Sequence, residues 1–285
     1  MMRVLAVDFG GTKTTIARVD REGRIHDRQK VPASRTVDAS VAQIEAAVGT
    51  APAIGIIIPG IYTASTGQAW CPNLWGTGEV PLLARLRERI GVPIGIGSDR
   101  AGHVLGEAWL GAARGLQDVV FVAIGTGIGV GILSGGRVVQ GAHGIAGAAG
   151  WFALDSDWKD DYAAMGCWEA ESAGPAIARR FAAPDTSAVV RAARAGDSSA
   201  RWILERAARY SAMGIANLIS VLNPEAVVLG GGVMQAAGDL LLDPIRSEVT
   251  RWAQPIAAAR CRIELTQLGE DAGLLGAAHL ALDLI

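Results

Sequence analysis

Two short loops rich in glycine and threonine could each hold a phosphate group. The first follows the apolar stretch Val4–Val7 and consists of Asp8, Phe9, Gly10, Gly11, Thr12 and Lys13. The second follows the apolar stretch Val119–Ile124 and begins with Gly125, Thr126 and Gly127. Glycine lets backbone N–H groups approach an anion closely, and threonine hydroxyls add donors. Two such loops facing each other across a cleft would hold a polyphosphate, which indicates nucleotide chemistry.

Each loop leads into a predicted β-hairpin, and this separates both from the common nucleotide motifs. The first hairpin is expected to turn near 21–23 and the second at 134–136. The sequence contains no G-x-x-x-x-G-K-[ST] motif, so neither loop is a Walker A loop. The second loop enters a β-rich segment, Val130–Val139, whereas a Rossmann loop opens a helix.

Two charged residues accompany the first loop, and each has two interpretations. Asp8 ends a predicted buried strand, where a carboxylate either completes a turn or lies near a phosphate-bound Mg²⁺, directly or through water. Lys13 either offsets phosphate charge or is simply solvated. The doubled loop favours the magnesium interpretation for Asp8 and leaves Lys13 open.

Asp99 is the strongest candidate for a catalytic residue. It follows the predicted strand Val92–Ile96 and precedes the predicted helix Arg100–Ala112. Ligands of α/β proteins gather at the carboxyl ends of such strands. An Asp there could accept the proton of a hydroxyl that attacks a γ-phosphate, as in kinases. The alternative is that Asp99 only caps the helix.

Further candidate residues lie in glycine-rich segments of the second half. Gly230, Gly231 and Gly232 separate a predicted strand from a predicted helix, where backbone could contact a flat ligand and the helix N-terminus could bind an anion. The alternative is a tight turn. His143 lies in a glycine-rich loop, and Trp151 lies in a predicted loop where an indole could stack on a sugar ring.

The elements that must position these residues alternate between strands and helices, which predicts an α/β fold. Further strands are predicted at Ile54–Ile58, Ala226–Leu229 and Arg262–Gln267, and further helices at Ala39–Val48, Val80–Ile90, Cys167–Phe181, Ser198–Leu222 and Asp271–Ile285. A boundary near Gly111–Gly115 predicts two domains. The N-terminal domain, 1–112, holds the first loop and Asp99. The larger C-terminal domain, 113–285, holds the second loop and the triple glycine, while its last helix, 271–285, is expected to pack on the N-terminal domain.

Composition excludes several classes of protein. The chain has 285 residues, half of them hydrophobic, and a formal charge of −2. No apolar run reaches the length of about 18 residues that spans a membrane. No basic cluster supports nucleic-acid binding, and the N-terminus lacks the layout of a signal peptide. Three widely spaced cysteines, Cys71, Cys167 and Cys261, argue against a disulfide framework and favour the cytoplasm.

These residues, taken in order, resemble the ROK sugar kinases, bacterial relatives of glucokinase in the actin/hexokinase-like superfamily. The resemblance covers essentially the whole chain. It implies a two-lobed, ribonuclease H-like α/β fold with duplicated sheets around a central cleft. It also implies ATP and Mg²⁺ as cofactors. In this resemblance, Asp8–Lys13 is the first phosphate motif, Gly125–Gly129 the second, and Leu229–Gly232 the adenosine motif.

The resemblance also implies which residues bind the acceptor. Asp99 takes the position of the catalytic base, preceded by Ser98 where the family usually has Asn. The sugar-binding positions of the family fall on Gly60, Asn73, Ser98, Asp99, His143, Trp151 and Glu169.

Two departures from the family pattern concern the sugar and a metal. Where the family typically has a sugar-binding Glu and a His that contacts sugar and zinc, this chain has Ala148 and Trp151. The cysteine motif for zinc falls on Asp160–Cys167, where Cys167 is the one cysteine left. Because a structural zinc usually needs four nitrogen or sulfur ligands, we expect no zinc site. We expect Trp151 to pack into the space of the metal-linked His.

The leading hypothesis is an ATP-dependent kinase that phosphorylates a hydroxyl of a sugar or sugar-like polyol, with glucose not the preferred acceptor. The alternatives are a non-catalytic sugar-binding regulator without a DNA-binding domain, and another ATP-using enzyme on the same scaffold. The acceptor and the choice between ATP and polyphosphate stay open. As partners we expect a small sugar-like substrate and a second copy of the chain in a homodimer, and neither nucleic acid nor a membrane.

Overall fold

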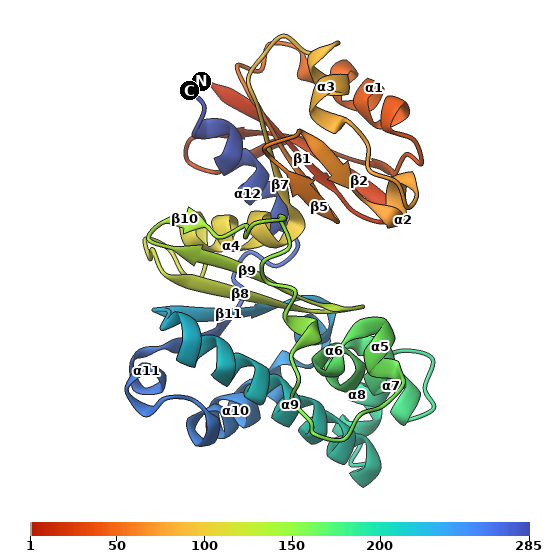
Figure 1. Cartoon of the computed structure of the whole chain (residues 1–285), viewed down its shortest axis with the longest axis vertical. Coiled ribbons are helices and arrows are strands. Elements are labelled where there is room, and N and C mark those ends of the chain that lie inside the picture. Colours follow the sequence, from red (N-terminus) through yellow and green to blue (C-terminus); the bar gives the residue numbers. More distant parts are fainter. Residues whose placement is uncertain (1) are drawn as a thin grey trace. The chain divides into compact units, whose positions relative to one another are not determined.

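The computed structural model of the chain describes residues 2–285 and divides it into two compact units, each with its own sheet (Figure 1). The first unit comprises residues up to Arg114, together with Val138–Ala146 and Glu270–Ile285. The second comprises Gly115–Arg137 and Gly147–Gly269. The short segment Val138–Ala146 and the last helix therefore belong to the unit that the N-terminal part of the chain builds.

The first unit contains a five-stranded sheet in the order β3-β2-β1-β4-β7. Its strands are β1 (Arg3–Phe9), β2 (Lys13–Asp20), β3 (Ile25–Pro32), β4 (Ile54–Ile58) and β7 (Ile94–Ser98), and a separate hairpin pairs β5 (Ile61–Thr63) with β6 (Gln68–Trp70). Its helices are α1 (Val37–Val48), α2 (Pro72–Trp75), α3 (Leu82–Arg87), α4 (Asp99–Leu110) and α12 (Asp271–Leu282).

Helices cover both faces of this sheet, and this explains why its central strands are apolar. Every residue of β4 is buried. Ile54, Ile56 and Ile58 share a hydrophobic core with residues of α1 and α3. On the other face, α12 packs on β1 and β4, and α4 packs beside α12. A strand buried on both sides gives the continuous apolar run that the sequence shows.

Glycines bring α4 and α12 into close contact. A Cβ atom at Gly106 would overlap the carbonyl oxygen of Ala272, and one at Gly276 would overlap the carbonyl oxygen of Gly102. A Cβ atom at Gly55 of β4 would overlap the carbonyl oxygen of Ala277. The last helix thus lies almost backbone to backbone against the helix that begins with Asp99.

The second unit repeats this arrangement with a sheet in the order β10-β9-β8-β11-β12. Its strands are β8 (Val119–Ile124), β9 (Ile128–Ser134), β10 (Arg137–Val138), β11 (Ala226–Gly230) and β12 (Arg262–Leu265). Its helices are α5 (Asp161–Met165), α6 (Cys167–Ser172), α7 (Gly174–Arg180), α8 (Thr186–Arg194), α9 (Ser198–Leu222), α10 (Gly232–Trp252) and α11 (Pro255–Arg260), with a 3₁₀ turn η1 (Ala149–Trp151).

The core of the second unit lies between its sheet and the long helices α9 and α10 (Figure 1). Trp168 of α6 is fully buried in this core. It packs on α9 at Gly214, where an added Cβ atom would lie 2.5 Å from the indole ring. Asn223 ends α9 in the left-handed conformation with φ +48°, and its N–H bonds to the carbonyl of Ile219.

The two sheets share one topology. In each, the first strand of the hairpin pairs antiparallel with its neighbour on one side and parallel with a strand on the other (β1 with β2 and β4, β8 with β9 and β11). The predicted α/β class with duplicated sheets is therefore confirmed. Each glycine-threonine loop connects the corresponding two strands of its own sheet.

The structure differs from the predicted elements in two helices. The helix predicted over 80–90 spans only Leu82–Arg87, because Val80 forms a bridge with Ala69. The helix predicted over 167–181 is two helices that meet at Ala173, where the backbone is extended with Pro175 next in the following turn. Among the described residues, none of the helices has the length and apolar composition to span a bilayer.

Candidate active site

The second glycine-threonine loop lies at the end of β8 and is closed by backbone hydrogen bonds. The N–H of Gly125 donates to the carbonyl of Gly127 at 2.9 Å. The carbonyl of Gly125 accepts the N–H of Gly174, the first residue of α7, at 2.8 Å. Thr126, at the tip, is exposed. The loop is thus fixed by its own backbone while its threonine remains accessible.

A pocket of about 440 Å³ opens beside this loop within the second unit. It is lined by the loop, by the start of α7, by the residues before and at the start of α8, and by the start of α10. The lining residues include Gly125, Thr126, Pro175, Asp185, Thr186, Ser187, Gly232 and Val233. The N-terminus of α10 carries unpaired N–H groups and a positive dipole end, which favours an anion.

Of the two glycines at the start of α10, Gly231 is required by this arrangement. Gly231 has φ +88°, and a Cβ atom there would lie 2.5 Å from the carbonyl oxygen of Ile124. Gly232 has open space where a side chain would be, and the Cβ position of Gly125 lies 3.6 Å from its nitrogen. The structure therefore brings the second loop and the triple glycine together, as two walls of one pocket.

Glu169 of α6 lies against the same loop. Its Oε2 accepts the N–H of Ile128 at 2.8 Å. A Cβ atom at Gly127 would lie 2.7 Å from that oxygen, and one at Gly150 would lie 3.1 Å from it. Burial raises the pKa of Glu169, although the Ile128 N–H opposes the shift. The carboxylate is thus fixed between the loop and η1.

In the first unit, the first loop joins β1 to β2. The N–H of Gly10 donates to the carbonyl of Lys13 at 2.9 Å, while Gly11, Thr12 and Lys13 are exposed. Asp8 precedes the loop and is largely buried. Burial, together with the charge of Asp99, raises the pKa of Asp8 to about 6, while His103 and Lys30 oppose the shift.

Asp99 begins α4, but the residue that caps this helix is Ser98. The Ser98 Oγ accepts the N–H of Ala101 at 3.2 Å, and its backbone is extended as at other N-caps. Asp99 Oδ1 accepts only the neighbouring N–H of Arg100, at 2.8 Å, among the bonds described. Asp99 also lies near Cys71, whose pKa is raised to about 12 by burial and by that carboxylate.

The other sugar-binding residues predicted in the first unit are Gly60, Asn73 and His143, and Gly60 lies against Cys71. A Cβ atom at Gly60 would lie 2.8 Å from the Cys71 Sγ. Asn73 follows in α2; it is exposed, and its carbonyl accepts a bond from Arg35 at 2.7 Å. His143 is exposed in a loop whose Gly144 packs on the backbone of Tyr62 in β5. Gly60, Asn73, Ser98, Asp99 and His143 all belong to this unit.

Ala148 and Trp151 belong to the second unit and flank Gly150. Ala148 is exposed, and Trp151 is exposed over 57% of its surface. The indole is therefore largely open to solvent, and its place in the space of the metal-linked His stays a prediction. A Cβ atom at Gly166 would lie 2.5 Å from the Trp151 Cα, so the end of η1 packs closely on that glycine.

The residues at the family's zinc positions do not fit that metal. Cys167 is the one thiol among them, Asp160 is exposed, and the hydroxyl of Tyr162 donates to Glu171 at 2.7 Å. Within residues 2–285, no group of three or more His, Cys, Asp or Glu side chains is placed to hold a metal ion. One thiol, one carboxylate and one phenol do not make the set of four nitrogen or sulfur ligands that a structural zinc usually needs.

Sequence reasoning missed two groups of residues. Asp185 caps α8 by accepting the N–H of Ala188 at 2.8 Å and lines the pocket beside Thr186. An Asp-Thr-Ser run before a helix is an N-cap signal that could have located it. Glu171 is buried with four donors around it. No local sequence pattern predicts this, because one of the donors, Arg206, is 35 residues away in the sequence.

Comparisons with known proteins agree over the whole chain. The sequence profile of the ROK family matches residues 4–284. The chain is 33% identical over 296 residues to the N-acetylmannosamine kinase of Escherichia coli (strain SE11), covering 98% of each chain. Its fold is similar to a ROK hexokinase from Thermus thermophilus (TM-score 0.86, 30% identity, 99% of both chains). A ROK family glucokinase from Streptomyces griseus, solved with glucose and AMPPNP, has a TM-score of 0.79 and 31% identity over 99% of both chains.

Proposed function

The chain belongs to the ROK family, and from this premise we propose that it is an ATP-dependent kinase that phosphorylates a hydroxyl of a sugar or sugar-like polyol. One observation carries the proposal. Ser98 caps α4, so the carboxylate of Asp99 is not needed for that purpose and lies beside Asp8 at the carboxyl edge of the sheet. A carboxylate in that place can serve as a general base.

We assign the nucleotide to the pocket of the second unit. Its glycine walls, Gly125 and Gly232, allow a ligand to lie directly on backbone, and the start of α10 favours phosphate. Thr126 adds a hydroxyl donor, and Gly231 and Gly232 would border the adenosine. The complex of the Streptomyces griseus glucokinase with AMPPNP supports ATP as the donor. Gly10, Gly11, Thr12 and Lys13 of the first loop are assigned to the terminal phosphate.

The proposed reaction is a direct transfer. Asp99 accepts the proton of the acceptor hydroxyl, and the resulting oxygen forms a bond to the γ-phosphorus. The bond between that phosphorus and the oxygen bridging to the β-phosphate breaks, and ADP leaves. Positioning and electrostatic stabilisation supply most of the rate in such transfers.

Mg²⁺ fits the residues present. Carboxylate oxygens are the ligands that Mg²⁺ prefers, and Asp8 offers one beside the first loop, directly or through water. Burial and the neighbouring Asp99 raise the pKa of Asp8 to about 6, and a cation bound there would favour the charged carboxylate. When bound, the ion would neutralise charge on the phosphates.

We propose that the acceptor is bound by Asn73, Asp99 and Glu169, assisted by Gly60, Ser98, His143 and Trp151. Glucose is not the expected preference, because Ala148 offers no polar group and Trp151 presents an indole. Related chains of similar identity include both glucokinase and N-acetylmannosamine kinase, so the family does not fix the sugar.

The second candidate is a non-catalytic sugar-binding regulator. A regulator needs no base, and the position of Asp99 therefore favours the enzyme.

We further propose a homodimer in the cytoplasm. Light scattering coupled to gel filtration measures the dimer.

The proposed activity is tested by coupled ADP release from ATP and Mg²⁺ with a panel of hexoses, amino sugars, N-acylated sugars and cyclitols. Acceptor-dependent ADP release that Asp99→Asn abolishes supports the kinase. Sugar binding detected by calorimetry, without ADP release for any acceptor, would support the regulator instead.

A further inference from the structure

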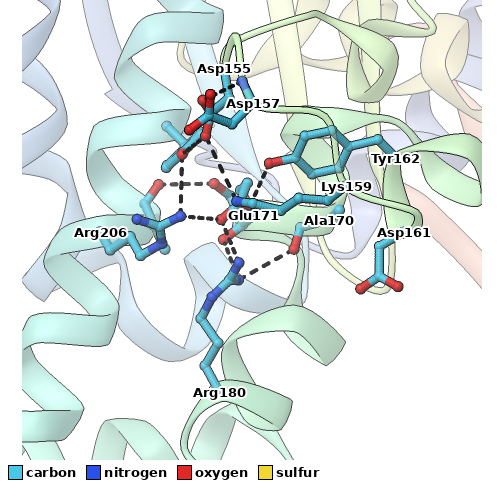
Figure 2. A network of polar contacts seen from close by, with 12 residues as sticks. Asp155, Asp157, Lys159, Asp161, Tyr162, Ala170, Glu171, Arg180 and Arg206 are labelled. Atoms are coloured by element: carbon cyan, nitrogen blue, oxygen red, sulfur yellow. Dashed lines mark hydrogen bonds and ion pairs between the residues drawn. The ribbon is translucent and has the colours of Figure 1, made fainter.

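A buried carboxylate, Glu171 of α6, lies at the centre of the polar network in Figure 2. Its side chain is 0% exposed. Oε1 accepts from Lys159 Nζ and from Tyr162 Oη, both at 2.7 Å. Oε2 accepts from Arg206 Nη2 at 2.7 Å and from Arg180 Nη2. We call these five residues the Glu171 cluster.

The four donors of the Glu171 cluster come from three separate parts of the second unit. Lys159 precedes α5 and Tyr162 is in α5, whereas Arg180 is in α7 and Arg206 in α9. Arg180 also donates from Nη1 to the carbonyls of Ala170 and Glu171, at 3.3 and 3.2 Å, and so holds the C-terminal turn of α6. The cluster thus joins three segments to one short helix.

A second layer completes the network. Tyr210 Oη donates to Asp155 Oδ2 at 2.8 Å, and Arg206 Nη2 donates to Tyr210 Oη at 3.2 Å. Lys159 Nζ lies 3.7 Å from the same Asp155 oxygen (Figure 2). Both ends of the segment Asp155–Gly166 are therefore tied down, one through Asp155 and the other through Tyr162.

This segment and the first residue of α6 contain Asp160–Cys167, the stretch that the family resemblance assigns to zinc. A structural zinc joins four ligands through one buried cation. Here, four donors are joined through one buried anion. The Tyr162 hydroxyl, at one of the former cysteine positions, is used by Glu171 and not by a metal.

The short helix α6 also carries Glu169, two residues before Glu171. A helix of six residues has little stability of its own, so its position depends on what it contacts. Trp168 anchors one side in the core, and the cluster anchors the other. Glu169 Oε2 must stay 2.8 Å from the N–H of Ile128, which leads out of the second loop.

We propose that the Glu171 cluster replaces a structural zinc ion in this chain and positions Glu169 at the second glycine-threonine loop. Glu171 is therefore a positioning residue, not a catalytic one. The expected effect on the KM for the acceptor rests on the proposed function and on the role of Glu169 in it. The expected effect on hydrogen exchange at the Ile128 amide does not depend on any activity.

Hydrogen–deuterium exchange on the full-length protein tests this directly, with the Ile128 amide as the reporter. Removing the central charge in Glu171→Gln takes the carboxylate partner from Arg180 and Arg206 and leaves Lys159 with Asp155 alone. Breaking an ion pair around a buried carboxylate is strongly destabilising. We expect exchange in 155–166 and at Ile128 to rise by about tenfold or more. Asp239→Asn is the matched control, because it breaks the exposed ion pair with Arg194 in the same unit, and it should leave both regions unchanged.

If Glu171→Gln fails to fold, Tyr162→Phe and Lys159→Gln each remove one donor and should raise exchange in the same two regions by smaller factors. EDTA should change neither region in the wild type, and elemental analysis should find far less than one zinc per chain. Where activity is measured, Glu171→Gln should raise the KM for the acceptor more than the KM for ATP.

Two kinds of result would overturn the proposal. Exchange that rises in 155–166 but not at Ile128, in any of these variants, would show that the cluster does not position Glu169. Increased exchange of 155–166 in EDTA, or one tightly held zinc per chain, would show that a metal has the structural role. A protein without kinase activity that still shows the expected exchange would reject only the proposed function.

Discussion

The carboxylate of Glu169 accepts the backbone N–H of Ile128 at 2.8 Å, and this bond joins helix α6 to the glycine-threonine loop of the second unit. The family resemblance implies that Glu169 binds the sugar that is phosphorylated and that the loop binds phosphate. One hydrogen bond therefore connects residues that we assign to the two substrates, and a change on either side is expected to reach the other.

Replacing Gly127 tests the loop side of this connection. A Cβ atom at Gly127 would lie 2.7 Å from Glu169 Oε2, so Gly127→Val must displace the carboxylate or the loop. Because small misplacements of substrate-binding groups cost large factors in rate, we expect the KM for ATP to rise by about tenfold or more. Gly91→Ala is the control, since Gly91 has no atoms within 4 Å of its Cβ position. Unchanged kinetics in Gly127→Val would remove the loop from the nucleotide site.

Asp8 should make stability depend on pH in magnesium-free buffer. Burial and Asp99 raise its pKa from 3.8 to about 6, so the folded protein binds this proton more tightly than the unfolded chain does. The contribution of Asp8 to stability is therefore greatest below pH 4 and falls as the pH rises from about 4 to about 6.

Asp8→Asn removes that pH dependence. The free energy of unfolding of the variant, relative to that of the wild type, should therefore increase from pH 4 to pH 8. The full shift corresponds to about 3 kcal/mol in the free energy of unfolding. Urea unfolding of both proteins at the two pH values measures it, with Asp38→Asn as the control at the start of α1. An equal effect of Asp8→Asn at both pH values would contradict the raised pKa.

Restoring the family residues tests the account of the acceptor. Ala148→Glu with Trp151→His returns the two polar groups that the family directs at a hexose. Each hydrogen bond is worth about 0.5 to 1.5 kcal/mol net, so together they should raise kcat/KM for glucose by roughly tenfold or more. The double variant and the wild type are compared on the same sugar panel. A wild type that already uses glucose best, with no gain in the variant, would show that these positions do not select the sugar.

The cap of α4 gives a prediction about stability. Ser98→Ala leaves the N–H of Ala101 without its side-chain acceptor and should lower the free energy of unfolding by about 1 kcal/mol. Asp99→Asn leaves the Ser98 cap in place and should change stability less. Calorimetry compares the two variants. The opposite order would mean that Asp99 has the structural role of a cap.

Local patterns predicted much of the fold. The apolar runs of β1, β4, β8 and β11 stand out because these strands are buried on both faces, and the repeated loop predicted a repeated sheet, which the structure confirms. The single helix predicted over 167–181 was wrong because Ala173 is extended, a break that only the following Pro175 signals. Pairing across long distances in sequence, such as Glu171 with Arg206, leaves no local pattern.

The candidate site was predictable where chemistry depends on short motifs. The structure brings Gly125, Thr126 and Gly232 to one pocket and sets Asp99 beside Asp8. The sequence did not predict Asp185 and Thr186 as pocket residues, because the sequence of a helix N-cap is the same whether or not the cap borders a ligand. The exposure of the Trp151 indole is a feature of the tertiary fold, which no sequence pattern expresses.

The most direct test of the proposed kinase is the turnover of Asp99→Asn. The substitution keeps the shape of the side chain and removes the proton acceptor, and general-base catalysis typically contributes ~10² to 10⁴-fold. With the best acceptor of the panel, kcat should fall by at least a factor of about 10², while the KM for ATP and the thermal midpoint stay close to those of the wild type. A variant that turns over at a near-normal rate would contradict the assignment of Asp99 as the base, and with it the proposed mechanism.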